Sequence, residues 1–239
     1  MQTKPLVNEV LQALQALANP DLKAGLVRFG INNQHALGIK IPVLQAYAKS
    51  LKKNQALALA LWEINLHKAR LLAIFLAVPA QFTEALMEQW IRRFDSWDIC
   101  DQACARIFVR VPWAFSKAQE WAVRTPEFEK RAGFVLMATL AIHDKKATNE
   151  AFMPFFPLMQ QEANDERNFV KKAINWALRQ VGKRNLTLNQ AAVQLAQQLK
   201  QQPAKSAQWI ATDALRELTN PTLLNKLTAK EAQLKTAAL

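Results

Sequence analysis

The chain has one short segment in which carboxylates are unusually dense. Residues 94–101 contain Asp95, Asp98 and Asp101 around Trp97. Asp95 precedes an expected helix and is placed to cap it, and Asp98 occupies the capping-box position three residues later. Asp101 lies a turn further in, where capping no longer accounts for a carboxylate.

Asp101 lies at the edge of an expected apolar stripe. Trp97 and Asp101 are four residues apart, so they lie about 40° apart around the helix axis. Asp101 is therefore either a groove residue that contacts a ligand or half of a buried ion pair. The stripe that we expect to be buried consists of Ile99, Cys100, Ala103, Cys104, Ile107 and Phe108.

Arg131 is a second charge that needs an explanation. It opens a helix in which residues 132–142 are apolar apart from Thr139, so its guanidinium must point outward or find a partner. An ion pair with Asp101 is the structural interpretation. A phosphate contact is the functional one, because the planar fork of arginine matches phosphate oxygens.

Segment 169–184 carries a basic stripe that includes an indole. Lys172, Trp176, Arg179 and Lys183 follow at spacings of four, three and four residues, which places them on one helical face. A charged stripe alone is usually a solvated face. The interleaved tryptophan favours nucleic acid, because cations bind phosphates while indole faces stack on bases and sugars.

The composition supports the same partner. The 239 residues include 31 Lys and Arg against 19 Asp and Glu, a net charge of +12. Such an excess favours a polyanion, nucleic acid first. The hydrophobic content of 51% is too high for a disordered chain. Only 5 glycines argue against Rossmann-like folds and turn-rich β-sandwiches.

The sequence gives no sign of a membrane segment or of a metal site. The longest apolar run, residues 132–142, is about half a membrane span, and the N-terminus does not read as a signal peptide. We expect a cytoplasmic protein without a membrane partner. His35, His67 and His143 lack zinc-ligand spacing, and no phosphate loop or HExxH motif occurs, so neither a metal nor a cofactor is expected.

Helical periodicity dominates the chain. Val7, Val10, Leu14 and Leu17 form one apolar stripe at helical spacing. Pro154 and Pro157 lie inside one predicted helix and are expected to kink or split it. No alternating strand pattern interrupts the series, so the sequence predicts an all-α fold. The predicted helices cover residues 7–18, 42–53, 55–62, 68–78, 82–94, 97–110, 115–124, 128–143, 150–163, 169–183, 188–201 and 206–219.

These helices are expected to form stacked pairs. A polar residue followed by Ala opens an apolar helix repeatedly, at irregular intervals that fit HEAT-like units better than a strict repeat. A helix pair cannot bury its own apolar face, so neighbouring pairs stack into a curved array. We expect one domain over residues 1–239, a curved right-handed solenoid of antiparallel helix pairs that helices within 206–239 complete or cap. A helical bundle without a repeat is the alternative.

Five segments, in order, resemble the DNA alkylation repair family of HEAT-like DNA glycosylases, the AlkD type. The segments are LGIKIPVL (37–44), LWEINLHKARLLA (61–73), SWDICD (96–101), KRA (130–132) and KKAINWALR (171–179). The resemblance spans about residues 25–200. The WDxxD-like segment is weakly specific alone, and all five segments in register are fairly specific.

The resemblance assigns roles to residues already singled out. It implies that Asp101 is the catalytic carboxylate, that Trp97 and Trp176 are cleft tryptophans and that Arg131 is the cleft arginine. Arg131, with Lys172, Arg179 and Lys183, would grip backbone phosphates, and Phe29 would also contact DNA, from the N-terminal part of the cleft. The chain departs from the family pattern at two positions: Phe29 lacks the hydroxyl of a cleft tyrosine in the best-known member, and Lys68 replaces a residue that is often acidic.

The implied reaction is hydrolysis of the N-glycosidic bond of cationic N3- or N7-alkylated purines in double-stranded DNA. A cationic purine leaves without a general acid, so one anion could suffice where ordinary glycosidases need two carboxylates. Asp101 would stabilise the sugar cation and orient water, in a monomer without a cofactor. Two alternatives stay open: a non-catalytic HEAT-like module that binds damaged or branched DNA, and a protein scaffold, which would leave the net charge unexplained.

Overall fold

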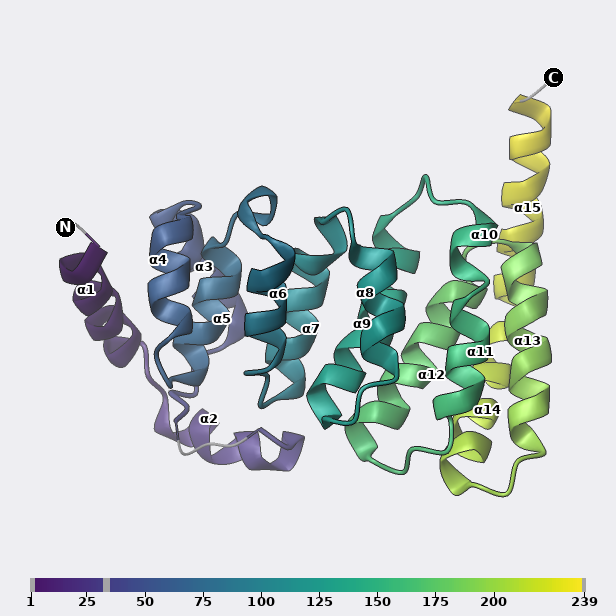
Figure 1. The fold of residues 1–239 in the computed structure, drawn as a ribbon, viewed down its shortest axis with the longest axis horizontal. Helices are drawn as coiled ribbons and strands as arrows, with labels where there is room; N and C mark the ends of the chain where they lie inside the picture. Colours follow the sequence, from purple (N-terminus) through teal and green to yellow (C-terminus); the bar gives the residue numbers. More distant parts are fainter. Residues whose placement is uncertain (1–2, 32–34, 238–239) are drawn as a thin grey trace. The chain divides into compact units, whose positions relative to one another are not determined.

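A computed structural model describes residues 3–31 and 35–237. All regular elements over these residues are helices (Figure 1), so the all-α prediction is confirmed. The contacts divide the chain into two compact units, Met1–Val111 and Pro112–Leu239. The prediction of one continuous array over the whole chain stays a prediction.

The first unit is built around α5. This helix packs against α3, α4 and α7, and α1 packs on α4. The elements are α1 (Thr3–Ala16), α2 (Pro20–Gly25), η1 (Leu26–Phe29), α3 (Ile41–Leu51), α4 (Gln55–Trp62), α5 (His67–Leu76), η2 (Pro79–Gln81), α6 (Glu84–Ile91), α7 (Trp97–Arg106) and η3 (Phe108–Arg110).

An aromatic cluster forms the core of the first unit next to α7. The rings of Trp62 and Trp90 stack with their centroids 4.0 Å apart. Phe94 meets Trp62 edge-on and stacks on Phe108. All four side chains are buried. Because Phe94 lies in the connection between α6 and α7, the cluster fixes where α7 begins.

A tight loop positions the short helices α2 and η1. Gly38 has a φ of +70°, and a Cβ there would lie 2.1 Å from the carbonyl oxygen of Asn19. The side chain of Asn19 accepts a hydrogen bond from the Leu22 amide at the start of α2. Periodicity did not predict α2 and η1, because neither buries a residue fully.

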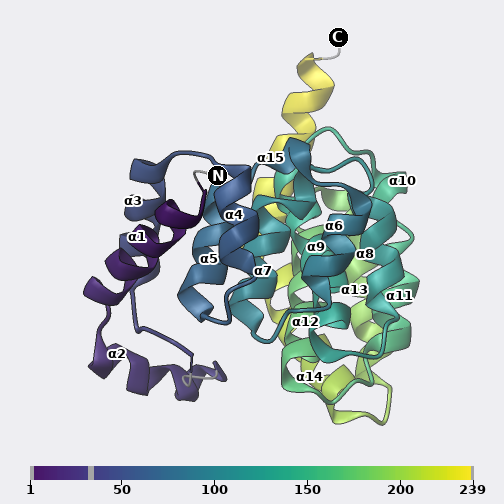
Figure 2. The same ribbon diagram turned by 60° about the vertical axis from the view of Figure 1, so that its left-hand side comes forward.

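The second unit is built around α9 and α12. Helix α9 packs against α8 and α12, and α12 packs also against α13 and α14 (Figure 2). The helices are α8 (Ala114–Ala122), α9 (Glu127–His143), α10 (Asn149–Phe152), α11 (Phe155–Glu162), α12 (Asn168–Gly182), α13 (Leu186–Lys200), α14 (Lys205–Leu218) and α15 (Pro221–Ala237).

Helix α9 contacts α8 at backbone distance. A Cβ on Gly133 would lie 2.4 Å from the amide nitrogen of Ala122 and 2.9 Å from the carbonyl oxygen of Ala118. Only glycine permits this approach. The apolar run after Arg131 is therefore core, with every residue from 131 to 141 buried.

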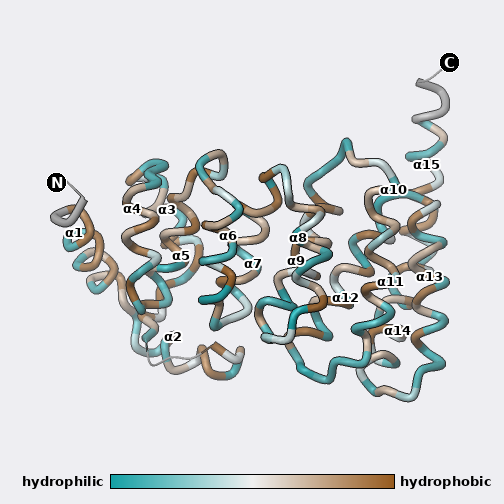
Figure 3. Tube along the Cα trace, in the orientation of Figure 1, coloured by the Kyte–Doolittle hydropathy of each residue, from teal (hydrophilic) through white to brown (hydrophobic). Residues whose placement is uncertain are grey.

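The sequence predicted most helices, with differences at their ends. Hydrophobic and hydrophilic segments alternate along most helices of Figure 3, which is the periodicity that predicted them. The predicted helix 150–163 is split into α10 and α11 around Pro154, as expected from its prolines. The predicted helices 82–94 and 97–110 are shorter than expected: α6 covers Glu84–Ile91, and α7 ends at Arg106, before the 3-10 helix η3.

Candidate active site

The start of α7 differs from the predicted cap. The residue before the first turn is Ser96, whose side chain makes no capping hydrogen bond. Asp95 is exposed and accepts from Arg70 Nη1 at 2.8 Å. The capping role expected for Asp95 is therefore wrong. Asp98 accepts from the first-turn amide of Ile99 at 3.0 Å, but the same carboxylate is buried and also bonds His67 on α5.

Asp98 is the centre of a buried polar cluster. Its Oδ1 accepts hydrogen bonds from His67 Nε2 at 3.0 Å and from Ser96 Oγ at 2.8 Å. Burial alone would raise the pKa of Asp98, but the hydrogen bonds and charges of His67, Ser96 and Lys68 outweigh it and lower the pKa. Burial lowers the pKa of Lys68, and the charge of Asp98 partly offsets that shift.

The cluster anchors the first turn of α7 to α5. Lys68, one of the two departures from the family pattern, is 3% exposed and belongs to this buried group. Sequence reasoning missed the group because its members come from two helices, and His67 and Asp98 are 31 residues apart.

Trp97 and Asp101 lie on α7 as predicted. The six residues of the expected stripe are all buried, while Trp97 and Asp101 are partly exposed. Trp97 Nε1 donates to the main-chain oxygen of Phe29 at 2.8 Å. The structure therefore brings Phe29 to Trp97 through its backbone, and the Phe29 ring stays 63% exposed.

The hydrogen bond to the Phe29 main chain fixes the plane of the Trp97 indole. The Phe29 ring itself does not cover the indole. A hydrogen bond from Nε1 restrains rotation of the Trp97 ring about its side-chain bonds, because the N–H must point at a fixed acceptor. Asp101 follows one turn later on α7 and is also partly exposed. The first unit thus presents an oriented indole next to a carboxylate.

Arg131 lies at the junction of α9 and α12 in the second unit. Its side chain is buried, and Nη1 donates to the main-chain oxygen of Phe169 at 2.6 Å. The ring of Phe169 packs against Phe128 with centroids 5.7 Å apart. One partner of the Arg131 guanidinium is therefore a main-chain carbonyl at the start of α12. The sequence analysis had considered an ion pair with Asp101 and a phosphate contact, and not this bond.

The basic stripe on α12 combines exposed and paired cations. Lys172 is exposed. Arg179 Nη1 and Lys183 Nζ reach the two carboxylate oxygens of Glu217 on α14, at 2.5 and 2.6 Å. Burial alone would raise the pKa of Glu217, but its bonds to Lys183 and Arg179 lower it. Two of the three cations of this stripe thus share one carboxylate.

Trp176 is tied to this group through Gln180. In the amide orientation that satisfies both donors, the Gln180 oxygen accepts from Lys183 Nζ at 3.0 Å and from Trp176 Nε1 at 3.2 Å. Like Trp97, Trp176 is partly exposed and has its N–H bound within the protein. Each of the two predicted cleft tryptophans therefore keeps a defined ring orientation in its own unit.

The described residues offer no metal site. Within residues 3–31 and 35–237, no group of three or more His, Cys, Asp or Glu side chains could hold an ion. Over the same described ranges, no helix is both long and apolar enough to cross a membrane. Cys100 and Cys104 are buried in α7 and form no disulfide, as expected.

Comparison with known proteins identifies the family. A solved structure described as "a new family of proteins related to the HEAT-like repeat DNA glycosylases with affinity for branched DNA structures" aligns with a TM-score of 0.70. The two chains are 21% identical over 88% of this chain and 95% of that one. This likeness confirms the predicted HEAT-like fold.

The sequences of curated proteins gave no significant match. The family model for the DNA alkylation repair enzyme matches residues 10–219, which includes all the residues singled out above. The chain therefore belongs to the DNA alkylation repair enzyme family.

Proposed function

We propose that the protein is a DNA glycosylase that removes cationic N3- and N7-alkylated purines from duplex DNA. The observation that carries the proposal is the pair on α7. Trp97 is oriented by its bond to the Phe29 carbonyl, and Asp101 lies one turn later on α7, partly exposed and next to the buried stripe. A fixed indole and a carboxylate are the groups that a sugar cation needs.

In the proposed reaction, the bond between C1′ and the purine nitrogen breaks, and its electron pair leaves with the base. The base is already cationic, so it departs neutral and needs no acid. Positive charge develops on the deoxyribose, where the Asp101 carboxylate stabilises it. The face of Trp97 adds cation–π stabilisation and excludes water from one side. Water adds to C1′ and loses a proton, and Asp101 orients that water.

The cations of the second unit would bind the DNA backbone. Lys172 is exposed and available to a phosphate. Arg179 and Lys183 are paired with Glu217, so a phosphate would have to compete with that carboxylate for them. Binding driven by phosphate contacts weakens steeply with salt because it releases counterions. We therefore expect the affinity for duplex DNA to fall linearly with salt on logarithmic axes.

The test is release of free 3-methyladenine and 7-methylguanine from methylated duplex DNA. We compare the wild type with Asp101→Asn, which keeps the side-chain shape and removes the charge. Asp95→Asn is the matched control, because Asp95 is an exposed carboxylate in the same segment. We expect Asp101→Asn to bind DNA and to lose excision, and Asp95→Asn to excise normally. Normal excision by Asp101→Asn would show that the catalytic assignment is wrong.

A second candidate function is a non-catalytic module for branched DNA. It is favoured by the affinity for branched DNA ascribed to the structural neighbour. The same assay separates the two candidates. A wild-type protein that binds four-way or flapped DNA more tightly than linear duplex, and releases no base, would favour the module.

A further inference from the structure

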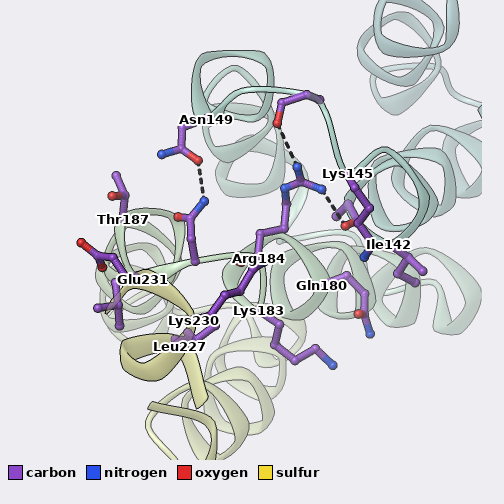
Figure 4. A pocket seen from close by; sticks show the side chains of 14 residues that line it. Ile142, Lys145, Asn149, Gln180, Lys183, Arg184, Thr187, Leu227, Lys230 and Glu231 are labelled. Atoms are coloured by element: carbon purple, nitrogen blue, oxygen red, sulfur yellow. Dashed lines mark hydrogen bonds between the residues drawn. The ribbon is translucent and has the colours of Figure 1, made fainter. Parts of the chain in front are cut away.

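The second unit contains a cavity that the proposed excision does not use. It has a volume of about 840 Å³, which lies within the range of small-molecule sites. It opens between the last turns of α9 and α12, the first turn of α13, and α15 (Figure 4).

The charges around this cavity are predominantly positive. Its lining includes Lys145, Lys183, Arg184 and Lys230 against the single carboxylate of Glu231. Lys183 is paired with Glu217, which does not line the cavity. Even with that pair set aside, three cationic side chains face one carboxylate, so an anion is the ligand that the lining favours.

Arg184 forms the frame of the cavity. Its guanidinium donates to the carbonyl oxygens of Ala141, Asp144 and Ala147 at 2.8, 2.7 and 2.9 Å, and two of these bonds are visible in Figure 4. On its other side, it lies over the ring of Phe152 at 4.1 Å. These bonds hold the connection between α9 and α10, which carries Lys145.

The two remaining lysines differ in how they are held. Lys230 Nζ donates to the main-chain oxygen of Arg184 at 3.1 Å, so its ammonium is fixed at the wall of the cavity with further protons to donate. Lys145 is exposed and its side chain makes no ion pair with a described residue. One fixed and one adjustable ammonium suit a phosphate monoester, which has three terminal oxygens.

The lining also offers amides and an apolar surface. The Asn185 amide nitrogen donates to Asn149 Oδ1 at 2.7 Å. This bond fixes the orientation of the Asn149 amide, whose own amino group can donate to a ligand. Ile142 and Leu227 add apolar surface. Amide groups hydrogen-bond the edges of bases, and apolar side chains cover a base or a sugar. An inorganic anion would use neither.

We propose that this cavity binds a nucleotide through its phosphate monoester, either as a free nucleoside monophosphate or as the 5′-phosphorylated end of a DNA strand. Lys145 and Lys230 bind the phosphate, and the amides with the apolar wall hold the nucleoside. The proposal does not depend on base excision and concerns a separate group of residues, apart from Lys183.

The experiment is calorimetric titration of the full-length protein with dAMP, deoxyadenosine and inorganic phosphate, and with a short single strand carrying either a 5′-phosphate or a 5′-hydroxyl. We expect the phosphorylated nucleoside to bind at least about tenfold more tightly than deoxyadenosine, because it adds charge-assisted hydrogen bonds. Binding of dAMP identifies the free nucleotide as a ligand. Binding of the 5′-phosphorylated strand alone identifies the strand end.

The matched variants are Lys145→Gln and Lys146→Gln. The two lysines are neighbours in the same connection, both are exposed, and only Lys145 lines the cavity. We expect Lys145→Gln to weaken nucleotide binding by about tenfold and Lys146→Gln to leave it unchanged. Equal losses in both variants would overturn the proposal. So would a protein that binds dAMP no more tightly than deoxyadenosine or inorganic phosphate and also binds the 5′-phosphorylated strand no more tightly than the 5′-hydroxyl strand. Asp101→Asn should bind the nucleotide normally, so a failure of excision leaves this result unaffected.

Discussion

Helices α8 and α9 are in backbone contact at Gly133, which makes Gly133→Ala an informative perturbation. The added Cβ would lie 2.4 Å from the Ala122 nitrogen, whereas ordinary van der Waals contact begins at 3.4 Å. The helices must therefore separate locally by 3.4 − 2.4 = 1.0 Å. The atoms that the Cβ would meet belong to the backbone of Ala118 and Ala122, so no side-chain rotation can relieve the clash.

The magnitude follows from two opposing effects. Overpacking a close-packed core costs about 1–3 kcal/mol and occasionally more, while alanine favours a helix interior over glycine by about 1 kcal/mol. With no flexible atom to yield, we expect overpacking at the upper end of its range, about 3 kcal/mol, and a net loss of stability of about 2 kcal/mol after the helical preference of alanine is subtracted. For a chain of this length, that corresponds to a melting temperature lower by roughly 4–8 °C.

The assay is thermal denaturation followed by far-ultraviolet circular dichroism, with urea denaturation as a second measurement. Gly25→Ala is the control, because its Cβ would meet only the end of the Arg28 side chain, at 3.3 Å. We expect the control to stay within about 0.5 kcal/mol of the wild type. A Gly133→Ala protein as stable as the wild type, or more stable, would refute the claim that α8 and α9 are in backbone contact.

Three further predictions concern the polar groups. The pKa of Asp98 is lower in the folded protein than in the unfolded chain. Its ionised form therefore stabilises the fold above about pH 4, and this contribution is lost as the pH falls through the folded pKa. Asp98→Asn should destabilise the protein at pH 7 and make its stability depend less on pH in acid denaturation. Trp97→Phe removes the donor to the Phe29 carbonyl and should slow excision about 2- to 10-fold, whereas Trp209→Phe should not, and equal rates would contradict the orienting role. Glu217→Gln frees Lys183 and leaves Arg179 with Asp213, whose Oδ2 lies 3.6 Å from Arg179 Nε. The salt dependence of DNA binding should steepen by about one unit of slope when the freed Lys183 contacts phosphate, and an unchanged slope would contradict that role of Lys183.

The sequence predicted what depends on local periodicity. The buried stripe of α7 and the position of Asp101 at its edge follow from spacing within one helix. The split between α10 and α11 follows from Pro154, because proline cannot continue a helical ladder. Helices α2 and η1 escaped because they expose apolar residues such as Val27 and Phe29, so they lack the one-sided pattern of a helix packed on a core.

What the sequence did not predict depends on contacts between helices. Asp98 was expected to cap α7 because capping considers only neighbouring residues, but His67 reaches it from α5. Glu217 pairs with Arg179 from 38 residues away. The sequence did contain a signal for the pair of Glu217 and Arg179. Asp213 and Glu217 lie four residues apart on α14 and so form an acidic edge, which predicts cations on the helix packed against it.

The stacked indoles of Trp62 and Trp90 have an optical consequence. Two parallel chromophores with centroids 4.0 Å apart couple their electronic transitions and are expected to give a paired signal of opposite sign in circular dichroism. Both indoles belong to the first unit and both are buried. Loss of that signal would therefore report the unfolding of the first unit alone, and would let its melting be followed separately within the intact chain without any added label.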